Sequence, residues 1–120
     1  MKKPSKTTLR RKLDKICSEI VRARGKCQWC WHKENLQCCH IFSRTYNNTR
    51  WDLDNLLCLC PKCHFYFHKN PIIFVEAVIN ILGKDKYDLL KEKRNQITKY
   101  TIDDLQTKLE VLTTLRKGNE

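Results

Sequence analysis

A chain of 120 residues is short, and its 24 Lys and Arg against 13 Asp and Glu give it a formal net charge of +11. That length suits a single domain with a modest core. The charge indicates a polyanionic partner, with nucleic acid as the first candidate, although a merely soluble basic protein would carry it too. No apolar run could span a bilayer and no secretory signal follows the charged N-terminus. We therefore expect a cytoplasmic protein without membrane contact.

The N-terminal part of the chain has a basic and helical pattern. Residues 1–6 are expected to form a basic tail, and residues 7–24 an amphipathic helix that Gly25 ends. Apolar side chains recur along this helix every three or four residues, at Leu9, Leu13, Ile16 and Ile20. The opposite face is basic, and it either contacts nucleic acid or forms an ordinary solvated surface.

Residues 26–70 hold nearly all of the Cys, His and Trp residues. Short strands are predicted over residues 37–42 and 56–59, with a polar loop over residues 45–49 between them. A helix is predicted from Pro61 to about Lys69, because proline is favoured in a first helical turn, where its missing N–H costs nothing.

Residues 71–117 are predicted to be helical. Asn70 is a candidate cap for a helix over residues 72–82, which is apolar on most sides and is therefore either buried or part of an interface. A more polar helix is expected over residues 84–99. Thr101 is a good N-cap for a last helix whose apolar stripe we expect to pack on the chain's own core.

Two C-x-x-C pairs, Cys27-Gln-Trp-Cys30 and Cys60-Pro-Lys-Cys63, predict a metal site. Each pair lets two thiolates reach one ion, and two pairs complete a tetrahedral four-sulfur site that suits structural zinc. A redox C-x-x-C is the alternative, but a second pair and the lack of a βαβ pattern argue against it. The remaining cysteines read as small buried apolar residues, namely Cys17, Cys38 and Cys58.

The segment QCCHIFSRTYNNTRWDLDN lies between the pairs and runs into LLCLCPKCHFYFH. The order His40-Ile41, Asn55-Leu56, Cys60-x-x-Cys63-His64 resembles the HNH endonuclease family, in the subgroup whose ββα-metal motif lies inside a four-cysteine zinc site. The resemblance covers about residues 27–68. HIFSR followed by RWDLDNLLCLCPKCH is also similar to small phage and prophage HNH proteins connected with recombination, the NinG-like kind.

This resemblance implies a role for each matching residue. His40 is the general base, since a neutral imidazole can take a proton from the attacking water near pH 7. Asn55 either braces the loop that carries the base or touches the metal. His64, together with His68 one helical turn later, would hold a catalytic divalent ion, which could be Mg²⁺, Mn²⁺ or Zn²⁺. Packing among neighbouring aromatic residues is the alternative for these two histidines.

One position departs from the family pattern. Cys39 stands before the base, where Asp or His is common as a metal ligand. A thiolate there would favour zinc over Mg²⁺, or Cys39 does not bind the ion at all, or the domain no longer cuts DNA. Arg44 and Arg50 flank the polar loop, and both are predicted to grip DNA phosphates.

Together these features predict an α+β fold: a small ββα-metal (HNH) core on a four-cysteine zinc ribbon, flanked by N- and C-terminal helices in a single domain over residues 1–120. The expected activity is metal-dependent hydrolysis of DNA phosphodiesters in a bacterial or phage-infected cell, leaving 5′-phosphate and 3′-hydroxyl ends. The alternatives are a structure-specific nuclease for junctions or flaps, a non-catalytic zinc-ribbon DNA-binding module, and an adaptor that binds through residues 72–82. The oligomeric state stays open, with a dimer as one option.

Overall fold

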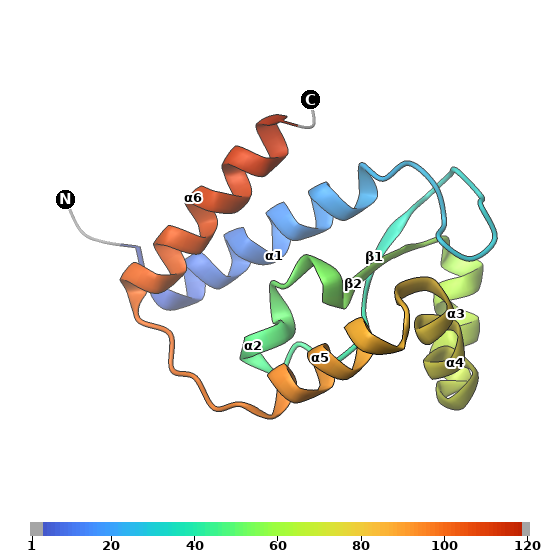
Figure 1. Cartoon of the computed structure of the whole chain (residues 1–120). Helices are drawn as coiled ribbons and strands as arrows, with labels where there is room; N and C mark the ends of the chain where they lie inside the picture. The colour runs from blue at the N-terminus through green and yellow to red at the C-terminus, as the bar shows by residue number, and fades with distance from the viewer. Residues whose placement is uncertain (1–3, 119–120) are drawn as a thin grey trace.

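The computed structural model describes residues 4–118, and residues 1–3 of the expected basic tail lie outside that range. The architecture is α+β (Figure 1). In chain order the elements are α1 (Lys6–Arg22), β1 (Gln37–His40), α2 (Asn47–Arg50), the 3-10 helix η1 (Leu53–Asn55), β2 (Leu56–Leu59), α3 (Pro61–Lys69), α4 (Pro71–Leu82), α5 (Lys84–Asn95) and α6 (Ile102–Gly118). Within the described residues, no helix is long and apolar enough to cross a membrane.

The antiparallel pair β1–β2 lies between two apolar clusters. Its register pairs Cys38 with Cys58 and Cys39 with Leu57. Because successive side chains of a strand point to opposite faces, Cys58 joins one cluster and Leu57 the other. All four side chains of β2 are buried, so β2 forms the centre of the molecule.

The first cluster is formed where α1 and α6 lie side by side against one face of the strands (Figure 1). The predicted apolar stripes of both helices are its main members, as expected: Leu9, Leu13, Ile16, Ile20, Leu105 and Leu112. The predicted cap of α6 is also confirmed, since the Thr101 hydroxyl accepts from the Asp104 N–H at 3.1 Å. Glu19 of α1 and Arg116 of α6 form an ion pair between the two helices.

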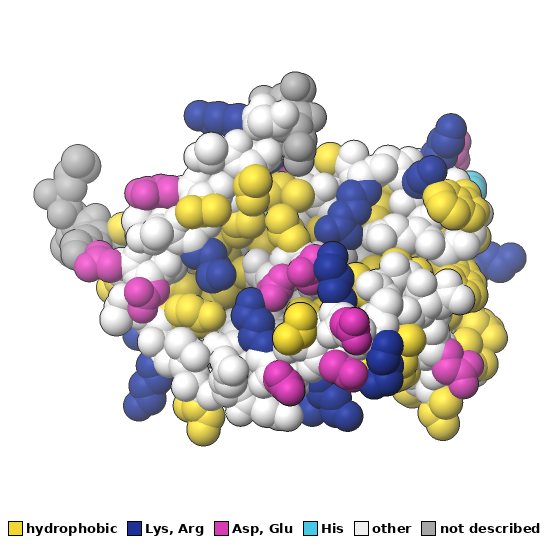
Figure 2. Space-filling view, viewed as in Figure 1, with side chains coloured by type: hydrophobic (Ala, Val, Ile, Leu, Met, Phe, Trp, Pro, Cys, Tyr) yellow, Lys and Arg dark blue, Asp and Glu magenta, His cyan; other side chains and the backbone are white. Residues whose placement is uncertain are grey.

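The second cluster joins the other face of the strands to α3 and α4. Phe67 of α3 and Val78 of α4 are buried in it beside Leu57 and Leu59. Most of α4 stays outside: only Ala77 and Val78 are buried in this helix, and apolar side chains gather on the surface where α3 and α4 lie (Figure 2). Figure 2 also shows that basic and acidic side chains are intermixed on this face of the molecule.

Several predicted boundaries were wrong. The basic tail is shorter than residues 1–6, because the Ser5 hydroxyl accepts from the Thr8 N–H at 3.1 Å and α1 begins at Lys6. The loop over residues 45–49 contains the short helix α2, and the helix predicted over 84–99 ends at Asn95. Asn70 precedes α4 but does not cap it with its side chain, which donates instead to the carbonyl of Tyr66 at 2.8 Å.

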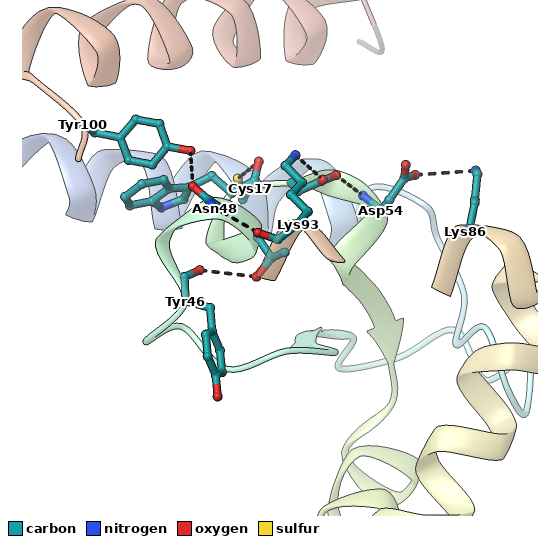
Figure 3. A network of polar contacts seen from close by, with 10 residues as sticks. Cys17, Tyr46, Asn48, Asp54, Lys86, Lys93 and Tyr100 are labelled. Atoms are coloured by element: carbon teal, nitrogen blue, oxygen red, sulfur yellow. Dashed lines mark hydrogen bonds and ion pairs between the residues drawn. The ribbon is translucent and has the colours of Figure 1, made fainter. Parts of the chain in front are cut away.

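Polar contacts connect α5 to the segment between the strands (Figure 3). The Asn48 side-chain amide of α2 donates to the carbonyls of Lys93 and Gln96. The Lys93 ammonium donates to Asp52 at 2.6 Å. These bonds hold α2 and η1 in place from the side opposite α1, so the segment that links β1 to β2 is fixed on both sides.

Candidate active site and zinc centre

The four predicted cysteine ligands converge. The sulfurs of Cys27, Cys30, Cys60 and Cys63 all lie within 4.8 Å of one another, and those of Cys30 and Cys60 are 3.6 Å apart. Tetrahedral zinc with bonds of about 2.3 Å requires sulfurs about 3.8 Å apart, so this donor set fits zinc. Burial raises the pKa of the Cys27 thiol, but backbone N–H donors, that of Cys30 first, outweigh this and lower it to about 7. Cys27 is thus prepared to bind as a thiolate, whereas burial raises the pKa of the Cys63 thiol, which would lose its proton on binding the ion.

The first knuckle is also bonded to the sheet. The Gln28 N–H donates to the carbonyl of Cys58, and the Cys58 N–H donates to the Gln28 side-chain oxygen, both at 2.8 Å. The first knuckle therefore extends the sheet along the edge of β2 that faces away from β1. The second knuckle starts at Cys60, directly after β2, and opens α3 with Pro61 in its first turn. A zinc ion here would join both ends of the β1–β2 segment.

We expect Cys63→Ser to lose one zinc per chain and to unfold at lower temperature, because the free energy of binding structural zinc is part of the folding free energy. Elemental analysis and thermal unfolding measure the two effects. Cys38→Ser is the matched control, since Cys38 lies outside the cluster. Equal zinc content in wild type and Cys63→Ser would contradict the ligand assignment.

A cavity of about 720 Å³ lies beside the zinc cluster and brings together residues from distant parts of the sequence. It is lined by three of the histidines singled out in the sequence and by one of the two arginines: His40, His64, His68 and Arg44. Cys39 and Phe74 of α4 also line it. We call this space the His40 cavity.

His40 is the last residue of β1 and is half-buried at the cavity wall. Burial lowers its pKa below the usual histidine value, while a backbone hydrogen bond to Arg50 opposes this. The positive charges of Arg44 and Arg50 lower it further, and Asp14 raises it. The imidazole is therefore neutral near pH 7. A neutral imidazole has one unprotonated ring nitrogen, which can accept a proton.

Asn55 acts on the turn that follows His40. The Asn55 side chain is fully buried; its oxygen accepts from the Phe42 N–H at 2.8 Å and its amide donates to the Phe42 carbonyl at 3.1 Å. The Asn55 carbonyl accepts from the Ile41 N–H at 2.8 Å. Of the two roles that the family resemblance left open, this geometry supports the brace. It also explains why β1 ends at His40 and not at the predicted Phe42.

Asp14 was missed by the sequence reasoning. It lies on α1, and its carboxylate accepts two hydrogen bonds from Arg50, at 3.1 and 2.7 Å, and one from the Trp51 indole at 2.8 Å. Burial raises the pKa of Asp14, but the bonds from Arg50 and Trp51 outweigh this and lower it. The only available signal was an acidic residue among the basic ones of the helix.

The contact with Asp14 makes Arg50 and Arg44 differ in their exposure to solvent. The Arg50 side chain is 20% exposed and is ion-paired with Asp14, and its predicted grip on DNA phosphates stays a prediction. The Arg44 side chain is 62% exposed, lines the His40 cavity, and lies 3.8 Å from the same carboxylate. Arg44 is therefore the arginine that remains available to a phosphate.

The two α3 histidines lie on one side of the His40 cavity. The Nδ1 atom of His64 is hydrogen-bonded to the Gln37 side-chain oxygen at 2.8 Å, which leaves Nε2 as the ring nitrogen that could bind an ion. Burial lowers the pKa of His64, and the neighbouring His68 lowers it further, so the His64 imidazole is suited to bind a cation in its neutral form. His68 is exposed.

Cys39 is less well placed as a ligand. It shares a strand face with Gln37, the partner of His64, but it is buried, and burial raises the pKa of its thiol to about 12. Among the described residues, the four zinc-cluster cysteines are the one group of three or more donors within mutual reach. The donor chemistry of His64 and His68 fits a divalent ion whose other ligands are water and substrate oxygens.

A comparison with known protein families agrees with this geometry. Residues 17–75 match the model of the HNH endonuclease family, a segment that contains both knuckles, both strands and the three cavity histidines. Over these residues the chain belongs to the HNH endonuclease family. No curated protein and no solved structure matches the chain significantly. Asp14 and all of α5 and α6 lie outside the matched HNH segment.

We expect Asn55→Ala to lower the free energy of unfolding by about 2–4 kcal/mol, because it leaves the buried N–H and carbonyl of Phe42 without partners. Nuclease activity per folded molecule should fall with it, since the turn after His40 loses its brace. Asn48→Ala is the matched control: it also removes a buried amide that bonds two carbonyls, but on the α5 side. An equal loss of activity per folded molecule in both variants would contradict a specific role for Asn55.

A second pair of variants isolates Asp14. Asp14→Asn removes the charge that pairs with Arg50 and should lower the free energy of unfolding by about 2–4 kcal/mol, together with activity. Glu19→Gln removes the ion pair of the same helix with Arg116, on the α6 side. Denaturant unfolding and cleavage rate are measured for both. If Glu19→Gln reduces the cleavage rate as much as Asp14→Asn, the Asp14 contact has no special link to the base.

Proposed function

We propose that this protein is a metal-dependent HNH DNA endonuclease in which His40 is the general base. The observation that supports this most strongly is the His40 cavity, where His40 of β1, Arg44 of the following loop, and His64 and His68 of α3 line one space. A non-catalytic zinc-binding module would need the four cysteines, but it would not require three histidines and an arginine to line one cavity.

In the proposed reaction, His40 takes a proton from a water molecule that attacks the scissile phosphorus in line with the leaving oxygen. The unprotonated ring nitrogen of the neutral imidazole accepts the proton. Arg44 grips the non-bridging phosphate oxygens. As the new phosphorus–oxygen bond forms, the bond from phosphorus to the 3′-oxygen breaks. The 3′-oxygen keeps its bond to the sugar and takes a proton from solvent water, which gives 5′-phosphate and 3′-hydroxyl ends.

His64 and His68 would hold the catalytic divalent ion. When bound, such an ion supplies positive charge to the phosphate and to the leaving oxygen. Imidazole donors suit zinc and other transition metals better than Mg²⁺, and a buried, protonated Cys39 adds no thiolate to the set. We therefore expect Mn²⁺ or Zn²⁺ to support activity better than Mg²⁺.

We also propose an origin, a mode of DNA binding and an oligomeric state for this protein. The similarity of the HIFSR and RWDLDNLLCLCPKCH segments to small phage and prophage HNH proteins supports an origin of that kind. The net charge of +11 supports DNA binding through phosphates, so affinity should fall steeply as salt rises. A dimer would suit a cut in both strands of a duplex.

We expect wild-type protein with added Mn²⁺ to nick plasmid DNA, and His40→Ala to lower the rate by about a hundredfold or more, because a general base contributes that much. Zinc content and thermal unfolding verify that the variant is folded. His32→Ala is the matched control, since His32 is an exposed histidine of the ribbon outside the cavity. Equal activity in His40→Ala and wild type would refute the base assignment. Salt-dependent DNA binding without nicking, under every ion tested, would favour the non-catalytic module.

A further inference from the structure

Trp31 has an unusual backbone conformation that neither the zinc site nor the proposed cleavage requires. It follows Cys30 directly, and its φ of 72° lies in the left-handed region. Among the described residues, only Trp31 and Asn35 (φ 56°) combine a positive φ with a side chain. Asn tolerates that region, but for a bulky residue it is an outlier, and glycine would be the unstrained choice. The ring is not retained for core packing, since Trp31 is 61% exposed.

The backbone under this exposed ring is rigid. The Trp31 N–H donates to the carbonyl of Cys27 at 3.0 Å, and the Cys27 N–H donates to the carbonyl of His32 at 2.7 Å. The same turn is bonded to β2 through Gln28. An aromatic side chain on such a base loses little conformational freedom when something stacks on it.

A cavity of about 420 Å³ lies beside Trp31, and we call it the knuckle groove. Arg24, Lys26 and Trp31 line one side, and Asn80 and Ile81 of α4 line the other. The Lys26 ammonium is 4.2 Å from the centroid of the Trp31 ring.

The positive charge of the groove is not cancelled. Arg24 donates to the carbonyl of Leu56 at 2.7 Å and to the side-chain oxygen of Gln28 at 2.9 Å, which are neutral acceptors. Neither Arg24 nor Lys26 is ion-paired with a carboxylate within residues 4–118. The groove thus presents an aromatic face and two cations, the combination that single-stranded nucleic acid recognises through stacked bases and backbone phosphates.

The groove is within reach of the His40 cavity. Pro71 and Phe74 line the cavity, and Asn80 and Ile81 line the groove, all from α4. At a rise of about 1.5 Å per residue these two sets lie roughly 9 to 15 Å apart along the helix. A few nucleotides of one strand, at about 3.4 Å or more each, cover that distance.

We propose that the knuckle groove binds an unpaired, single-stranded segment of the DNA, with one base stacked on Trp31 and adjacent phosphates against Arg24 and Lys26. This rests on the proposed function for its choice of DNA as partner, and it deepens that function by naming the substrate class: DNA with a single-stranded arm, such as a flap. An acidic peptide would use the two cations but would give the strained, exposed ring no role.

Binding can be measured apart from cleavage. Zinc-loaded protein in the His40→Ala background is titrated into a labelled oligo(dT) and into a labelled duplex of equal length, and binding is followed by fluorescence anisotropy. The oligo(dT) has about 16 nucleotides, which is within the site size of single-strand binders. Trp31→Gly removes the ring and relieves the positive φ. We expect it to weaken oligo(dT) binding about five- to one-hundredfold, to change duplex binding less than twofold, and to leave the unfolding temperature unchanged or higher.

Asn35→Gly is the matched control, because it relieves the other positive φ of the same ribbon without removing a ring; its oligo(dT) affinity should equal that of the parent. Trp31→Tyr should retain most of the affinity, because a ring remains for stacking. The proposal is overturned if Trp31→Gly binds oligo(dT) as the parent does, or loses duplex and oligo(dT) affinity equally. It is also overturned if poly-glutamate displaces labelled oligo(dT) as well as unlabelled oligo(dT) does, and if Trp31→Gly weakens the binding of both polymers equally. A failure of the proposed nuclease would appear separately, as wild-type protein that binds DNA without nicking it.

Discussion

The contact on which the rest of the structure depends is the convergence of four cysteine sulfurs from two knuckles that lie about 30 positions apart in the chain. A two-stranded sheet is marginally stable by itself. Here each strand is four residues long, and both ends of the segment are joined by one cluster. The second knuckle also starts α3, so one centre fixes the helix that carries His64 and His68 relative to the strand that carries His40.

The surroundings of His40 then depend on two polar contacts of different origin. Asn55 holds the turn after His40 from within the HNH motif, through both backbone groups of Phe42. Asp14 holds Arg50 from α1, outside the segment that matches the family model. The second contact suggests why the HNH core is packed against a long helix pair: α1 contributes a carboxylate to the surroundings of the site as well as apolar surface.

The parts of the fold that were predictable are those with a local physical signature. Pro61 in the first turn and the paired knuckles located α3, and the apolar run over residues 56–59 located β2 with its observed bounds. The stripe on α6 and its Thr101 cap were visible for the same reason, because periodicity and capping are encoded in adjacent residues.

What the sequence could not reveal depends on contacts between distant residues. β1 ends early because of a bond from Asn55, thirteen positions after Phe42. The bond between Arg50 and Asp14 could not be predicted, because nothing near Arg50 in sequence shows the carboxylate on α1. The positive φ of Trp31 and the groove beside it have no signature in the adjacent residues of the sequence. The convergence of the three histidines was anticipated only through the family resemblance.

The most direct test of the central claim, that the zinc cluster positions a DNA-cutting site at the His40 cavity, is anomalous diffraction from crystals of the protein with duplex DNA and Mn²⁺. The account predicts zinc at the four cysteines, manganese at His64 and His68, and a DNA phosphate beside His40 and Arg44. Manganese bound away from both histidines, or DNA phosphates that all lie outside the His40 cavity, would contradict it.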